Sequence, residues 1–176
     1  VLIDQAIHTM DLMQWIVGDI ERLEASMANR THHIIDVEDV AEAVIFFKNG
    51  AVGSLYACNY YTYDADVLLE VHGENGTATI EKDKAIIRIN GKPERKVYAE
   101  GDQEVIGKSY WGVSHKVQID EFYKDVLAGR QVTIDGVEGR KALEFVRAIY
   151  YSATTGEPVQ FPFDEPLGFT PPSLTN

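Results

Sequence analysis

The chain has 176 residues, of which 45% are hydrophobic and 25% are charged, and its formal net charge at pH 7 is −12. These values are typical of one globular domain and exclude a disordered chain, and no apolar run approaches the roughly 18 residues that a membrane span needs. The negative charge excludes nucleic acid and anionic membranes as expected partners, because it repels phosphate groups.

Two features of the sequence bear on the cellular location of the protein, namely the number of cysteines and the N-terminus. Cys58 is the single cysteine, so no disulfide can form within the chain. No signal-peptide pattern precedes the first helix, and both features favour a cytoplasmic location. The sequence opens at Val1, without Met and directly inside an apolar helical pattern, so we expect it to belong to a longer protein.

Residues 2–17 form the first predicted helix. A polar stripe runs along it, formed by Asp4, His8, Asp11 and Trp15. Apolar side chains occupy most of the remaining circumference, which predicts a helix buried on nearly every side.

Short β-rich runs follow from Leu23 onward. Val40–Phe47 and Ala51–Tyr60 flank Asn49-Gly50, a pair that accepts the positive φ angles of a tight turn, so they predict an antiparallel hairpin. Four further runs, separated by turn residues, are Val67–His72, Thr77–Glu81, Ala85–Ile89 and Glu94–Tyr98. The middle of the chain is therefore predicted to be an antiparallel meander.

Helical spacing returns in the last third of the chain. Ser114 and Asp135 are candidate N-caps of two helices, which we expect to end near Gly129 and Gly156. The prolines that follow predict an extended tail over 164–176. A helix, a run of strands and two helices predict an α+β domain over 1–163, with one large, mainly antiparallel, open-faced sheet and helices on one face.

On the helix-free face of this sheet, apolar side chains would be exposed to water unless another surface packs against them. Along the predicted strand, Tyr56 and Tyr60 share one side and Leu55 and Tyr61 share the other, so neither side is clearly polar. We therefore expect a homo-oligomer that forms through the sheet face.

Asp4 and His8 are spaced so that their side chains meet on one face of a helix. Taken alone, this pair fits a metal site, a general acid/base pair or a buried structural hydrogen bond, and the structural interpretation leads. His32-His33 lacks the further ligands of a zinc site and is interpreted as loop, so no metal is expected.

Several motifs, taken in order along most of the chain, favour a catalytic interpretation of Asp4 and His8 over the structural one. They are Asp4-x-x-x-His8 with Trp15 and Gly18-Asp19, Val37-Glu38-Asp39 leading to Phe47-Lys48-Asn49-Gly50, Val71-His72-Gly73-Glu74-Asn75-Gly76-Thr77, the segments 114–122 and 135–143, and Thr155-Gly156-Glu157-Pro158. In this order they resemble the C-terminal domain of the Gfo/Idh/MocA oxidoreductases, the family of glucose-fructose oxidoreductase and inositol dehydrogenase.

The resemblance implies that NAD or NADP is bound mainly by an N-terminal Rossmann domain, which this chain does not contain. The sequence has no G-x-G-x-x-G, so the phosphate cradle of a dinucleotide site is not present. The family's catalytic Lys stands in a Glu-Lys-Pro motif of that other domain, whereas Gly91-Lys92-Pro93 here lies in a predicted turn. We therefore expect the 176-residue chain alone to be inactive.

The reaction that the resemblance implies is hydride transfer between nicotinamide and a sugar, polyol or related hydroxyl compound. His8 would remove the hydroxyl proton, and Asp4 would bind the reacting hydroxyl or orient the imidazole. Tyr61, Trp111 and His115 are further candidates for substrate contacts, with packing, capping or surface roles as the alternatives.

Two other functions stay open at this point. One is an NAD-dependent glycoside hydrolase of the same family, and the other is a non-catalytic binding or oligomerisation module. The presence of both Asp4 and His8 argues against a pseudoenzyme.

Overall fold

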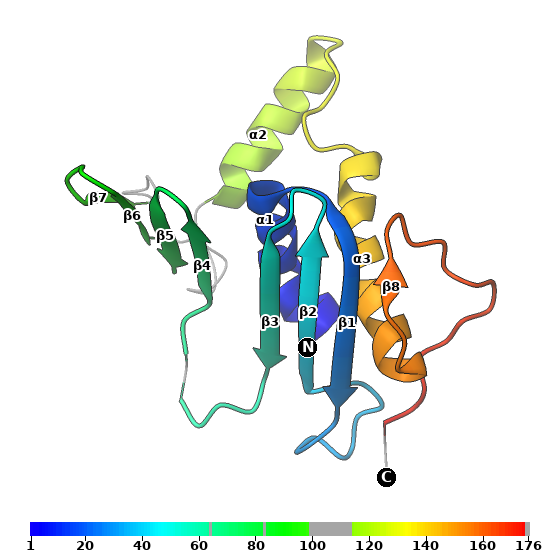
Figure 1. Cartoon of the computed structure of the whole chain (residues 1–176). Helices are drawn as coiled ribbons and strands as arrows, with labels where there is room; N and C mark the ends of the chain where they lie inside the picture. The colour runs from blue at the N-terminus through cyan, green and yellow to red at the C-terminus, as the bar shows by residue number, and fades with distance from the viewer. Residues whose placement is uncertain (64, 83, 99–113, 175–176) are drawn as a thin grey trace. The chain divides into compact units, whose positions relative to one another are not determined.

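The computed structural model describes residues 1–63, 65–82, 84–98 and 114–174 (Figure 1). They belong to two compact units, one formed by Val1–Ala65 with Val137–Asn176 and the other by Asp66–Gly136. Each unit is described separately below.

The first unit contains a four-stranded antiparallel sheet in the order β3-β2-β1-β8. The strands are β1 (Ile20–Ala28), β2 (Val40–Phe47), β3 (Val52–Cys58) and β8 (Val159–Gln160). The hairpin predicted around Asn49-Gly50 is confirmed as β2–β3, although β3 ends at Cys58, two residues earlier than expected. The short β8 pairs with β1 from the far end of the sequence, which no local pattern predicted.

Three helical elements accompany this sheet, and Figure 1 shows α1 and α3 on the same side of it. They are the π-helix η1 (Leu2–Ala6), α1 (Ile7–Val17) and α3 (Gly136–Thr155). The start of α3 directly after Asp135 agrees with the capping prediction.

The core of this unit lies between the sheet and these helices. Alternate β2 residues, Ala41, Ala43, Ile45 and Phe47, are buried. Phe145, Val146 and Ile149 of α3 are fully buried. The period-2 burial of the strand matches a sheet with one covered face.

The first helix is less enclosed than its composition suggested. Only Leu2, Met10 and Met13 are buried along η1 and α1, while Trp15 is 82% exposed. The expectation of a helix buried on nearly every side is therefore wrong, because only one flank of α1 faces the sheet.

The second unit contains a four-stranded meander in the order β4-β5-β6-β7. Its elements are β4 (Leu68–Gly73), β5 (Gly76–Glu81), β6 (Lys84–Ile89), β7 (Arg95–Tyr98) and α2 (Ser114–Leu127). The predicted meander is confirmed, with strand ends displaced by at most one residue. Ser114 is assigned as the first helical residue of α2.

The α+β class and the antiparallel pairing are confirmed. Within the described residues, however, the strands form two four-stranded sheets and not one large sheet.

The C-terminal tail runs along α3. Arg147 pairs with Glu165, and its guanidinium lies 5.3 Å from the centre of the Phe169 ring. The Tyr151 ring packs against Phe163 and Phe169 at centroid distances of 5.3 and 5.1 Å. These contacts tie the tail to a buried helix.

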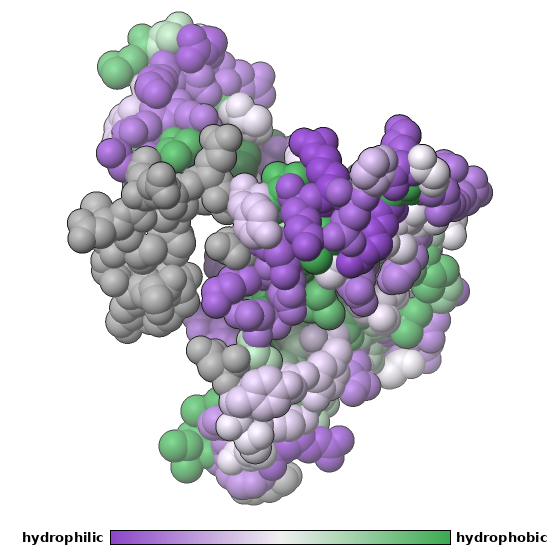
Figure 2. Space-filling view, turned by 90° about the vertical axis from the view of Figure 1, so that its left-hand side faces the viewer, coloured by the Kyte–Doolittle hydropathy of each residue, from purple (hydrophilic) through white to green (hydrophobic). Residues whose placement is uncertain are grey.

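One face of the molecule, shown in Figure 2, is mainly polar. Hydrophilic residues predominate on the face shown in Figure 2, and apolar residues form small separate groups on it. Among the helices that the structure describes, none has both the length and the apolar character that crossing a bilayer requires.

Candidate functional site

Asp4 and His8 stand on consecutive parts of one helical segment. Asp4 is in the middle of η1 and His8 is the second residue of α1. Both are exposed, and neither side chain forms a hydrogen bond or ion pair with another described residue. The pair is therefore not a buried structural hydrogen bond, and its polar atoms are open to a ligand.

The backbone under this pair is unusual. The Gln5 and Ala6 N–H groups both donate to the carbonyl of Val1, at 3.0 and 3.1 Å, and the Ile7 N–H donates to the carbonyl of Leu2. A single π turn of this kind is rare and is frequently found at functional sites.

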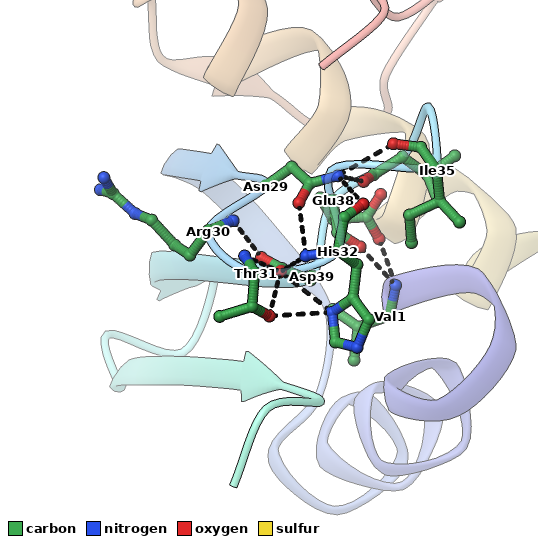
Figure 3. A network of polar contacts seen from close by, with 9 residues as sticks. Val1, Asn29, Arg30, Thr31, His32, Ile35, Glu38 and Asp39 are labelled. Carbon is green, nitrogen blue, oxygen red and sulfur yellow. Dashed lines mark hydrogen bonds and ion pairs between the residues drawn. The ribbon is translucent and has the colours of Figure 1, made fainter. Parts of the chain in front are cut away.

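Glu38 lies two residues before β2 and anchors the start of this segment (Figure 3). Its side chain is only 2% exposed, and its Oε1 accepts hydrogen bonds from the backbone nitrogens of Val1 at 2.8 Å and Leu2 at 2.7 Å. Unpaired N–H groups at a helix start are thereby satisfied.

Tyr150 of α3 completes this contact. Its hydroxyl donates to the Glu38 carboxylate, with both oxygens at 3.2 Å. Burial raises the pKa of Tyr150, and the neighbouring Glu38 raises it further, so the hydroxyl stays protonated as the donor.

Asp39, the next residue, points into the loop between β1 and β2 (Figure 3). Its carboxylate accepts hydrogen bonds from the backbone N–H groups of Arg30 and Thr31, both at 2.7 Å, and contacts the His32 ring at 3.1 Å. Burial by itself raises the pKa of Asp39, but these hydrogen bonds outweigh it and hold the pKa well below its ordinary value.

Asn29 holds the same loop from its other end. Its Nδ2 donates to the carbonyls of His32, Ile35 and Val37 at 2.9, 2.9 and 3.2 Å, and its Oδ1 accepts from the His32 N–H. His32, which sequence analysis assigned to a loop, is thus part of a loop scaffold.

The remaining predicted site residues have different positions. Tyr61 follows β3, is 52% exposed and makes an edge-to-face contact with Tyr63 at a centroid distance of 5.7 Å. His115 is exposed near the start of α2 and belongs to the unit Asp66–Gly136. Trp111 lies outside the described residues.

A pocket of about 420 Å³ lies in the first unit, beside the contact between Glu38 and Tyr150. It is lined by Met27, Asp36, Val37, Glu38, Tyr150 and the tail residues 170–174. The Ser173 hydroxyl donates to Asp36 at its rim. Neither Asp4 nor His8 lines it, so it is not the space in front of the candidate pair.

The described residues offer few ligands for a metal ion. Over 1–63, 65–82, 84–98 and 114–174 no group of three or more His, Cys, Asp or Glu side chains is placed to hold a metal. The N-terminus of the first helical segment receives the Glu38 carboxylate, which leaves it unsuited to a pyrophosphate.

Comparison with known proteins identifies a family and individual proteins to which this chain is similar. Residues 1–161 match the family described as oxidoreductase family, C-terminal alpha/beta domain (Gfo/Idh/MocA). A D-apiose dehydrogenase of Paraburkholderia graminis is 28% identical over 165 residues, which are 89% of this chain and 44% of that protein.

Solved structures share the fold. A levoglucosan dehydrogenase in complex with NADH and levoglucosan aligns with a TM-score of 0.75 at 23% identity, over 90% of this chain and 49% of its own. The WlbA dehydrogenase of Bordetella pertussis, in complex with NADH and UDP-GlcNAcA, aligns with a TM-score of 0.71 at 26% identity, over 91% and 47%. The chain spans about half the length of the relatives that it matches.

Proposed function

Since the chain belongs to the Gfo/Idh/MocA oxidoreductase family, as its C-terminal α/β domain, we propose that it is the substrate-binding part of an NAD(P)-dependent dehydrogenase. The substrate would be a sugar, a polyol or a related hydroxyl compound. The similarity to a D-apiose dehydrogenase and to WlbA with bound NADH supports this class.

The observation that carries the proposal is the exposed pair Asp4 and His8 on one helical segment, whose side chains bond to no other residue that the structure describes. An imidazole is the side chain best able to accept and release a proton near neutral pH, and His8 is free to accept the proton of a substrate hydroxyl. Asp4 would bind that hydroxyl and favour the imidazolium that forms.

The cofactor would be held mainly by a part of the protein outside this chain, a proposal supported by the match to the family's C-terminal domain and by the chain's covering 44% of a relative's length. When bound, NAD(P) supplies the hydride acceptor. The chain alone would then position substrate without completing the reaction. Tyr61, Trp111 and His115 are proposed as further substrate contacts. A cytoplasmic location, which fits the single Cys58, belongs to the same proposal.

We also propose that the protein self-associates through the open face of the sheet β3-β2-β1-β8. This face presents Val44, Val52 and Tyr56 at 44%, 63% and 53% exposure. A second copy would cover these apolar side chains with the same surface.

A substrate screen tests the proposed function. The complete open reading frame that includes this chain would be expressed and assayed with a panel of sugars and polyols, with NAD and NADP, at the nicotinamide absorbance. Substrate-dependent formation of reduced cofactor is expected. Cleavage of a glycoside without net formation of reduced cofactor would instead indicate the hydrolase of the same family, and no turnover of either kind would contradict the proposal.

A further inference from the structure

We propose that Glu38 is a positioning residue, which sets the geometry of the turn that carries Asp4 and His8. Its catalytic consequence rests on the function proposed above, whereas its structural part stands on contacts within this chain.

The first step is the environment of the Glu38 carboxylate. It is 2% exposed, and the Leu2 N–H that it accepts belongs to a residue that is fully buried. A buried N–H group without a partner is strongly unfavourable. The bond to Leu2 involves an ordinary peptide N–H, so it does not depend on the charge of the Val1 amine.

The second step is that the peptides held by Glu38 also hold the π turn. The carbonyl of Val1 accepts the Gln5 and Ala6 N–H groups, and the carbonyl of Leu2 accepts the Ile7 N–H. A chain of hydrogen bonds therefore runs from Glu38, through the Val1–Leu2 peptide, to Gln5 and Ala6, the two residues that follow Asp4. The next carbonyl, that of Leu2, holds Ile7, which directly precedes His8.

The third step is that Glu38 is itself held in place. The Tyr150 hydroxyl contacts both carboxylate oxygens from the buried helix α3. The carboxylate of Asp39, the neighbouring residue, accepts hydrogen bonds from the backbone N–H groups of Arg30 and Thr31. The carboxylate that holds the turn is thus fixed by both a helix and a loop, which is how supporting residues preorganise a site.

Hydrogen exchange of the 176-residue chain tests the structural part. Glu38→Met removes the acceptor at similar volume, Glu38→Gln keeps an acceptor oxygen, and Glu21→Gln is a control at an exposed glutamate of β1. In Glu38→Met we expect exchange of the amides of residues 5–7 to rise roughly tenfold relative to the amides of β1 and β2. Glu38→Gln should show a smaller rise and Glu21→Gln none.

Tyr150→Phe serves as a second variant should Glu38→Met fail to fold. It removes the hydroxyl and leaves the ring in the core, so the same local pattern is expected at smaller size. Exchange that rises equally across residues 5–7 and the sheet, or does not rise at residues 5–7, would overturn the proposal.

Kinetics of the complete protein test the catalytic part of the proposal. Each variant is measured about 10 degrees below its own Tm, so that all variants are compared at a similar stability. Glu38→Met should lower kcat roughly tenfold with NADH affinity unchanged, and Glu38→Gln should recover part of the loss. If His8→Ala slows turnover and Glu38→Met does not, the positioning role is refuted. If the parent protein oxidises no sugar or polyol, the proposed function fails, and the exchange pattern still decides whether Glu38 sets the turn.

Discussion

Asp39 accepts hydrogen bonds from both the backbone N–H and the hydroxyl of Thr31, at 2.7 and 2.8 Å. Asp39 is fully buried, so replacing it leaves these donors without a partner. We expect Asp39→Ala to lower the free energy of unfolding by about 3 kcal/mol, and Asp36→Ala, at an exposed position in the same loop, to lower it far less. Denaturant titration measures both.

The same carboxylate predicts a pH dependence. Because the pKa of Asp39 is lower in the folded than in the unfolded chain, its stabilising effect is present above the unfolded value and is lost as pH falls toward the folded value. The Tm should therefore fall below about pH 4, and this fall should be shallower in Asp39→Asn. Parallel Tm curves for the two proteins would contradict this assignment.

His8→Ala in the complete protein should lower kcat by about 10² to 10⁴ with little change in cofactor affinity, because the imidazole acts on the substrate hydroxyl. Asp4→Asn should slow turnover as well, since an amide cannot stabilise an imidazolium. Asp11→Asn, exposed further along α1, is the matched control. Near-normal turnover of His8→Ala would show that His8 is a surface residue without a catalytic role.

The 176-residue chain should bind neither NAD nor NADP with micromolar affinity, because its described helix starts lack a glycine-rich approach for pyrophosphate. Calorimetric titration at protein concentrations of about 100 μM, far above a micromolar Kd, is the measurement. Heat of binding with a one-to-one endpoint would show that the cofactor site lies on this chain.

Charged substitutions should separate subunits if the open face of the first sheet is the interface. Val52→Glu and Tyr56→Glu place carboxylates in that face, whereas Ile34→Glu changes a loop residue that is 96% exposed. Light scattering of the complete protein should show an oligomer in the parent and in Ile34→Glu, and smaller species in the other two. A monomeric parent, or unchanged mass in Val52→Glu, would refute the sheet-face interface.

Two glycines should respond to alanine in opposite directions. A Cβ at Gly76, where φ is +155°, would lie 2.0 Å from the carbonyl oxygen of Arg88, so Gly76→Ala should disrupt the β5–β6 pairing. Gly139 lies in α3 with open space at its Cβ, and Gly139→Ala should raise the free energy of unfolding by about 0.5 to 1 kcal/mol. Equal effects in urea titration would contradict this contrast.

Local pattern was sufficient for most elements of this protein. The Asn49-Gly50 turn, the period-2 runs of the meander and the capping signal at Asp135 depend on neighbours within a few residues, so sequence analysis found the hairpin, the strands and α3. The order of degenerate motifs also led to the family that the comparisons confirm.

Only the tertiary structure decided how distant segments meet. The pairing of β8 with β1, the division into two sheets and the exposed flank of α1 depend on contacts that a local period cannot encode. Glu38 is the clearest case. In the sequence it is only one residue of a motif, yet in the structure it bonds to Leu2 and Tyr150, which are 36 and 112 positions away. A buried carboxylate is defined by the donors that surround it, and those donors come together only when the chain has folded.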